Sequence, residues 1–267
     1  SFRWVGSDID GTILTSHHQV DEQLIEVMPE LEKAKIPFVL ASARSPLGMQ
    51  PIAHKLGLPE NPIACYNGAL VLEGNRTIIE HPVDKTEIQE LLSYLSTDYP
   101  SVSVNIYSGK NWITNQLDKW SQLEAGITGE SPILKELQET VSDSEPPIHK
   151  LLLIDEPKVI QDLHQKLLSM DFPQTAFYLS KDNYLEVTAK HVSKEHALLE
   201  DAKYYDIPLE QVMTIGDNFN DSPMLALAGL GIAMGNAPEG VKETANLVTV
   251  CNDDHGVAQA ITEHVLN

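Results

Sequence analysis

Short apolar segments alternate with segments of helical periodicity near both ends of the chain, and no other feature restricts the fold as much. In the segment 21–35, Leu24, Met28 and Leu31 recur at helical spacing. The next segment, 36–43, is a continuous apolar run, as expected of a strand buried on both faces. The last third repeats this order. Repeated β-α-β units predict an α/β fold: a Rossmann-like parallel sheet with helices on both faces.

The middle of the chain has a different pattern. The two strand-like segments within 175–190 follow each other with no helix between them, which predicts an antiparallel α+β domain. We place this inserted domain at 82–187 and the core at 1–81 and 188–267. The polar segment Val141–Pro147 is predicted to be a surface loop within the insertion. Ligands of open α/β sheets bind at the carboxyl ends of the strands, so an insertion there could form a cap that sets specificity.

The composition excludes some classes of function. The formal net charge is −21, with 39 acidic and 18 basic residues. This argues against a nucleic-acid or anionic-membrane partner, because both require clustered Lys and Arg. No apolar stretch reaches the roughly 18 residues needed to cross a bilayer. Cys65 and Cys251 form no CxxC pair, so we expect reduced thiols and a cytoplasmic protein. The oligomeric state is not predicted.

The segment "DIDGT" places Asp8 and Asp10 at the end of the first apolar run. Positions i and i+2 share a face of a strand, so both carboxylates point into one space if the strand continues past Asp8. Two such groups share either a proton or a cation. Gly11 allows a sharp turn, and Thr12 offers a hydroxyl group and an N–H. The alternative is an ordinary Asp-Gly turn after a strand.

The segment "GDNFND" follows another apolar run near the other end of the chain. Asp217 occupies the same kind of position as Asp8, and Asn220 and Asp221 follow within a tight loop. Carboxylate and amide oxygens at this spacing suit a hard divalent metal ion. The alternative is a helix cap formed by Asn220 or Asp221, which is compatible with a functional role.

Two further positions could hold an anion. Ser42, in "ASAR" with Arg44, closes the second apolar run, where a hydroxyl group can bind a phosphate oxygen or cap a helix. Lys194 opens a predicted helix, although the helix dipole favours acidic residues there. It could neutralise a bound phosphate, or it could be an exposed surface lysine.

The order acid pair, hydroxyl, lysine and acid cluster resembles the four motifs of the haloacid dehalogenase-like hydrolase superfamily. The motifs read "DIDGT", "ASAR", "SKEHAL" and "GDNFND", and the insertion lies between the second and the third. This arrangement resembles the Cof-type phosphatase branch with a large α+β cap, as do "YNGA" (66–69) and "YLEV" (184–187). The chain departs from that branch at His191 and Glu195, where the branch often has glycine.

The resemblance implies a role for each motif residue. Asp8 would be the nucleophile and Asp10 the general acid and base. Mg2+ would be held by the Asp8 carboxylate, the Asp10 backbone carbonyl and Asp217.

The phosphoryl oxygens would be held by the backbone N–H groups that follow Asp8 and by the side chains of Lys194, Ser42 and Asn220. Gly11 and Thr12 would form the phosphate-binding turn. Asp221 would support the metal site or orient Lys194, and Arg44 would support the site as well.

The implied function is a Mg2+-dependent phosphatase that hydrolyses a small phosphorylated metabolite, such as a sugar phosphate, through an aspartyl-phosphate. Two alternatives are a phosphomutase and a phospho-metabolite-binding protein without turnover. An intact set of Asp8, Asp10, Lys194 and Asp217 disfavours the binding protein, because binding alone does not require Asp10. The sequence predicts neither the substrate, the pathway nor the specificity residues of the cap.

Overall fold

The computed structural model describes all 267 residues, and the chain forms two compact units. The core unit comprises Ser1–Ile79 and Ser193–Asn267, and the inserted unit comprises Glu80–Val192. The predicted insertion, 82–187, lies within the second of these. No helix is both long and apolar enough to span a membrane.

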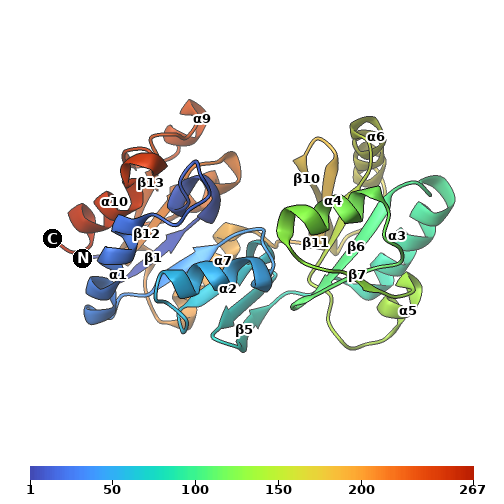
Figure 1. The fold of residues 1–267 in the computed structure, drawn as a ribbon, viewed down its shortest axis with the longest axis horizontal. Coiled ribbons are helices and arrows are strands. Elements are labelled where there is room, and N and C mark those ends of the chain that lie inside the picture. The colour runs from blue at the N-terminus through green and yellow to red at the C-terminus, as the bar shows by residue number, and fades with distance from the viewer. The chain divides into compact units, whose positions relative to one another are not determined.

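The core unit is built on an eight-stranded sheet in the order β14-β13-β12-β1-β2-β3-β4-β5 (Figure 1). The strands from β14 to β3 are parallel, and β4 is antiparallel to β3. Central strands are buried on both faces, which is why their sequences are apolar throughout. The strands are β1 (Trp4–Ser7), β2 (Phe38–Ala41), β3 (Pro62–Cys65), β4 (Leu70–Glu73), β5 (Arg76–Glu80), β12 (Val212–Gly216), β13 (Leu230–Ala233) and β14 (Leu247–Val248).

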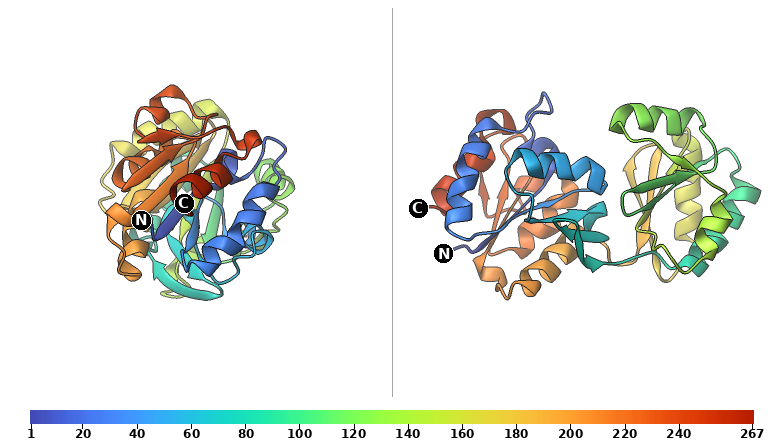
Figure 2. Two further views of the ribbon diagram at one scale, coloured as in Figure 1. Left: turned by 90° about the vertical axis from the view of Figure 1, so that its left-hand side faces the viewer. Right: turned by 60° about the horizontal axis from the view of Figure 1, so that its bottom comes forward.

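Helices cover both faces of this sheet, as predicted (Figure 2). One face carries α1, α2 and α10, and the other carries α7 and α8. The chain moves from β1 towards β3 and from β12 towards β14, which are opposite directions along the sheet, so right-handed crossovers place the connecting helices on opposite faces. The core helices are α1 (Glu22–Lys33), α2 (Pro46–Lys55), α7 (Lys194–Tyr204), α8 (Ser222–Leu227), α9 (Glu239–Lys242) and α10 (Gly256–His264). Capping side chains start three of them: Asp21 for α1, Ser45 for α2 and Ser193 for α7.

The structure corrects several predicted boundaries. The apolar sequence 61–72 predicts a strand with a turn at Asn67-Gly68, and the structure shows that this turn, Tyr66–Gly68, separates two antiparallel strands, β3 and β4. Tyr66 and Asn67 both have positive φ, so the chain reverses there. β1 ends at Ser7, and Ile9–Ile13 forms a tight turn instead of continuing the strand. The sequence 47–58 predicts a helix whose first turn Pro51 leaves undefined, and in the structure this helix, α2, begins at Pro46 and contains Pro51.

The inserted unit has its own sheet, in the order β10-β11-β9-β6-β7-β8. All neighbouring pairs are antiparallel except β7 and β8. The strands are β6 (Ser103–Ser108), β7 (Asn111–Thr114), β8 (Ile133–Leu134), β9 (Lys150–Ile154), β10 (Thr175–Lys181) and β11 (Tyr184–Ala189). The helices are α3 (Lys85–Asp98), α4 (Lys119–Thr128), α5 (Leu137–Ser142) and α6 (Pro157–Leu168).

The core of the inserted unit lies on one face of this sheet. Ile88 and Leu91 of α3 and Leu163 of α6 pack there against Ile106 and Leu151 of the sheet, all fully buried. Val141 is fully buried as well and belongs to α5, so the predicted surface loop at 141–147 begins two residues too early. The separate core shows that this unit buries its own apolar surface.

Candidate active site

The carboxyl ends of β1, β2 and β12 bring three predicted motifs to one edge of the core sheet. Ser7 is in register with Leu40 of β2 and with Ile215 of β12. Asp8 therefore lies one residue before the level of Asp217, which follows β12, and of Ser42, which follows β2. Parallel pairing thus brings together residues that are more than 200 positions apart in the chain.

Asp8 is the first buried carboxylate of the site. It is 7% exposed, and its Oδ1 accepts a hydrogen bond from the Ile9 N–H at 2.8 Å. Burial raises the pKa of Asp8 well above its usual value, although the charge of Lys194 opposes the shift; the carboxylate of Asp221 adds to it. A cation next to Asp8 would favour its ionised form.

Lys194 lies between two carboxylates and is not a surface residue. It is 4% exposed, and its Nζ is 2.9 Å from Asp8 Oδ1 and 2.8 Å from Asp221 Oδ1. Burial alone would lower the pKa of Lys194, but these two carboxylates reverse that effect and raise it. The ammonium group therefore stays charged and links the start of α7 to the ends of β1 and β12.

Asp221 uses both of its carboxylate oxygens inside the protein. Oδ1 accepts from Lys194, and Oδ2 accepts from the N–H groups of Asp217 and Asn218 at 3.0 and 3.1 Å. Its side chain is fully buried. It closes a capping box with Asn218, so Asn218, and not Asn220, is the capping asparagine of this loop. This geometry suits a residue that orients Lys194.

Three carboxylates form a group that fits a metal ion. Ligand oxygens of Asp8, Asp217 and Asp221 all lie within 4.8 Å of one another. Burial raises the pKa of Asp217, and the charge of Asp221 contributes to this shift. One lysine cannot balance three ionised carboxylates, and oxygen ligands of this kind match the preference of Mg2+. The residues present therefore fit the implied metal.

Asp10 lies differently from the prediction. Because β1 ends at Ser7 and Gly11 adopts a φ of 75°, the Asp10 carboxylate does not join the acidic group. It forms a bidentate pair with Arg44, with Nε–Oδ2 and Nη2–Oδ1 distances of 3.0 and 2.7 Å. The side chain of Asp10 is 55% exposed and that of Arg44 is 36% exposed. Arg44 thus contacts the first motif through Asp10.

The other predicted phosphate-binding residues lie at the same edge of the sheet, but they differ in burial and in hydrogen bonding. Ser42 is buried, and its Oγ accepts from the Arg44 N–H at 3.1 Å, while Ser45, not Ser42, caps α2. Thr12 donates its hydroxyl proton to Asp217 Oδ1 at 2.8 Å. Asn220 is exposed on the loop after β12.

The turn Tyr66–Gly68 packs against two parts of this site, a placement that the four motifs do not predict. The Asn67 N–H donates to the Ser42 carbonyl at 2.8 Å. A Cβ added at Gly68 would lie 2.6 Å from the Cβ of Ala197 in α7. The turn therefore packs closely against the first turns of the helix that carries Lys194. The short "YNG" sequence, with its turn-forming Asn-Gly pair, was the available signal.

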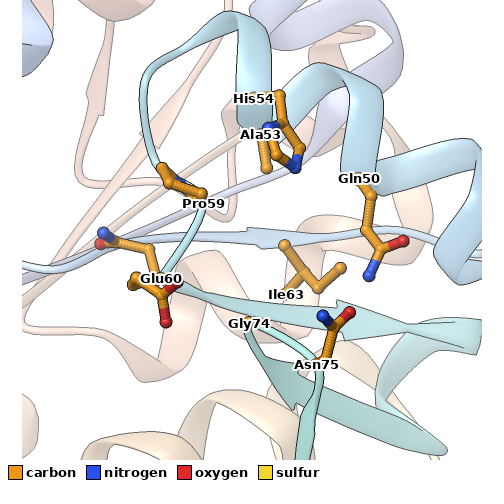
Figure 3. Close-up of a pocket in the computed structure, with 9 residues that line it drawn as sticks. Gln50, Ala53, His54, Pro59, Glu60, Ile63, Gly74 and Asn75 are labelled. Atoms are coloured by element: carbon orange, nitrogen blue, oxygen red, sulfur yellow. The ribbon is translucent and has the colours of Figure 1, made fainter.

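A separate pocket of about 170 Å³ lies between α2 and the turn that joins β4 and β5 (Figure 3). Gln50 and His54 of α2 line it together with Glu60 and Asn75. No lysine, arginine or predicted motif residue contributes to its wall. The pocket is therefore unsuited to a phosphate group, and the acidic edge remains the candidate site.

Comparison with known proteins identifies the family. The sequence profile described as haloacid dehalogenase-like hydrolase matches residues 5–261. The chain belongs to this family of hydrolases. A Haemophilus influenzae protein that is provisionally named a phosphatase is 35% identical to this hydrolase over 266 residues, 98% of each chain. The Bacillus subtilis protein named 5-amino-6-(5-phospho-D-ribitylamino)uracil phosphatase YcsE is 26% identical over 98% of this chain and 95% of its own.

The solved structures agree with this assignment. A haloacid dehalogenase-like hydrolase from Bacteroides thetaiotaomicron superimposes with a TM-score of 0.89 at 26% identity, covering 98% of this chain and 99% of its own. The predicted superfamily, the Cof-type resemblance and the α/β fold class are thus confirmed for this hydrolase.

Proposed function

We propose that the chain is a Mg2+-dependent phosphatase that hydrolyses a small phosphorylated metabolite through an aspartyl-phosphate on Asp8. The observation that carries this proposal is the placement of the Lys194 ammonium group 2.9 Å from Asp8 Oδ1, beside the acidic group completed by Asp217. The phosphatase names of the relatives support the reaction type.

The roles of the chain's own residues follow from this arrangement. A carboxylate oxygen of Asp8 attacks phosphorus, and the bond from phosphorus to the leaving oxygen breaks. Asp10, as a carboxylic acid, gives its proton to the leaving alkoxide. Asp10 then takes a proton from the water that attacks the phosphoryl group, which releases inorganic phosphate and restores Asp8.

The charges around the phosphoryl group support this sequence. Lys194, Ser42 and Asn220 are the side chains that we assign to its oxygens. Asp8 and Asp217, with the Asp10 carbonyl, would hold Mg2+, and Asp221 would orient Lys194. When bound, Mg2+ would supply the positive charge that offsets repulsion between the carboxylates and the phosphoryl oxygens.

Asp10 has to leave Arg44 for part of this cycle. Ion pairs as exposed as this one typically contribute about 1 kcal/mol or less, so we expect the exchange to cost little.

For the substrate we propose a phosphorylated sugar or sugar alcohol. The support is the YcsE relative, whose name specifies a phosphorylated ribityl compound. A formal charge of −21 leads us to propose a small anion held by local contacts, and not nucleic acid or a membrane. Both cysteines are free, consistent with the predicted cytoplasmic location.

The decisive experiment is a phosphatase screen over sugar phosphates, nucleotides and vitamin phosphates, with Mg2+ and with excess chelator. The wild-type chain should release inorganic phosphate only with Mg2+. Asp8→Asn should release none while it unfolds at a similar temperature, and Asp171→Asn, the same change at an exposed position, should match wild type. Turnover by Asp8→Asn would exclude Asp8 as nucleophile. Isomerised sugar phosphate without phosphate release would indicate a phosphomutase instead.

A further inference from the structure

Asn236 lies in the loop after β13, outside all four motifs, yet it contacts the first of them. Its Nδ2 donates to the Gly11 carbonyl at 2.9 Å, and its Oδ1 accepts from the Asn252 N–H at 3.0 Å. A backbone N–H can only donate, so the contact with Asn252 fixes which end of the amide faces Gly11. The side chain therefore bridges the turn Ile9–Ile13 and the segment before α10.

The backbone that carries Asn236 is firmly anchored. The Met234 N–H donates to the carbonyl of Gly216, the residue before Asp217, at 3.0 Å. The Gly235 N–H donates to the Val250 carbonyl at 3.2 Å, and a Cβ at Gly235 would lie only 2.9 Å from the Cys251 nitrogen. The loop thus has little freedom to shift, so Asn236 presents its amide at a defined position.

The same turn is in contact with Asp217. A Cβ added at Gly11 would lie 2.1 Å from Asp217 Oδ2, and Thr12 donates to Asp217 Oδ1 at 2.8 Å. Through these contacts the turn sets the orientation of a carboxylate in the acidic group. Asn236 and Asp217 therefore contact the same turn, Ile9–Ile13.

We propose that Asn236 is a positioning residue, which holds the Gly11 carbonyl so that the turn Ile9–Ile13 keeps Asp217 oriented for the metal ion. This inference rests on the proposed function for its kinetic consequences. Asn236 acts through Gly11. Asn252 supports Asn236 because its N–H orients the Asn236 amide, and Asn252 Nδ2 also donates to the Leu14 carbonyl at 3.0 Å. Outer groups that orient metal ligands typically change metal affinity or activity by about 10- to 100-fold when removed.

The test replaces the donor and keeps the acceptor. Asn236→Asp retains an oxygen for the Asn252 N–H but places a second oxygen against the Gly11 carbonyl. We expect a Kd for Mg2+ about tenfold higher, measured by calorimetry without substrate, and a kcat about tenfold lower with little change in KM. Gln161→Glu is the matched control, because Gln161 is an exposed amide that donates to the Asp182 carbonyl at 3.3 Å in the inserted unit. It should leave both values unchanged.

Asn236→Ala, which removes the donor without adding charge, serves if the aspartate variant does not fold. Wild-type Mg2+ affinity and kcat in a folded Asn236 variant would overturn the proposal. So would equal losses in Gln161→Glu, because they would show a general effect of charge. A wild-type chain that binds Mg2+ but hydrolyses no phosphate ester would refute the proposed function alone, since Mg2+ affinity still tests Asn236.

Discussion

At the scale of single residues, the acidic group depends on a position that has no side chain. Gly11 has a φ of 75° and approaches the Asp217 carboxylate so closely that a methyl group would overlap it. Two requirements therefore coincide at Gly11: a backbone conformation that L side chains rarely adopt, and open space next to a charged group.

These two requirements can be separated by experiment. Gly11→Ala should destabilise the protein and strongly weaken Mg2+-dependent turnover, because the methyl group displaces Asp217. Gly57→Ala is the control: its φ is 72° and no atom lies within 4 Å of the added Cβ. It should cost only the roughly 1–2 kcal/mol of a left-handed alanine, measured by urea unfolding, and leave turnover intact. Equal effects of both substitutions on turnover would show that the contact with Asp217 is unimportant.

The sequence predicted the positions of those site residues that directly follow a strand or begin a helix. Asp8, Lys194, Asp217 and Asp221 meet because parallel pairing aligns the ends of their strands and α7 begins beside them. The sequence did not predict the direction of the Asp10 carboxylate, because that direction depends on the conformation of the turn. The partner roles of Arg44 and Asn236 are long-range contacts, which a local pattern does not encode.

At the scale of elements, helix α7 is joined to strand β1 at two levels. Lys194 contacts Asp8, just beyond the carboxyl end of the strand, and Asp201 accepts a hydrogen bond from the Trp4 indole N–H at 2.7 Å at its beginning. Asp201 is 2% exposed, and its Oδ1 has no hydrogen-bond partner. Burial raises the pKa of Asp201 to about 7, while the bond from Trp4 opposes the shift.

This shift predicts a pH dependence of stability. The folded state binds the Asp201 proton more tightly than the unfolded state, so the contribution is present below pH about 4 and is lost as pH rises through about 7. The loss amounts to a few kcal/mol at most, since one pKa unit corresponds to about 1.4 kcal/mol. Asp201→Asn should flatten the wild-type fall in unfolding free energy between those pH values, measured by urea titration. A variant with the wild-type slope would refute this assignment.

Secondary structure was predictable where periodicity and caps agree. The helical periodicity of residues 85–98 predicts a helix there, and α3 (Lys85–Asp98) occupies this segment, with Asp84 as its cap. In the segment 61–72, the Asn67-Gly68 pair indicates the turn, but the apolar sequence does not show that the chain reverses into a second strand, because the reversal depends on positive φ at Tyr66 and Asn67. α9 is only four residues long, although its surrounding sequence is compatible with a longer helix.

At the scale of the whole molecule, the charge of −21 opposes the approach of an anionic substrate. We therefore expect kcat/KM for a phosphate ester to rise when NaCl is increased from about 20 to about 300 mM, because the Debye length falls below about 10 Å. The measurement needs saturating Mg2+, so that screening of the metal ion does not contribute. A fall in kcat/KM under these conditions would show that local positive charge governs substrate approach.

The separate apolar core of the inserted unit leads to a prediction about folding. A fragment of residues 80–192 should unfold cooperatively on its own, because its buried apolar side chains contact one another across its sheet and helices. Circular dichroism during urea titration would show one sigmoidal transition. A gradual change without a transition would mean that the unit depends on the core, and that 82–187 is not an independent domain.

The pairing of β1 with β12 has a consequence for biosynthesis. β1 lies between β2 and β12 in the finished sheet, but residues 212–216 leave the ribosome more than 200 residues after it. Throughout that interval the nascent chain carries an apolar strand with one side unpaired, a state prone to aggregation. We therefore expect this strand to need protection from aggregation until residues 212–216 emerge.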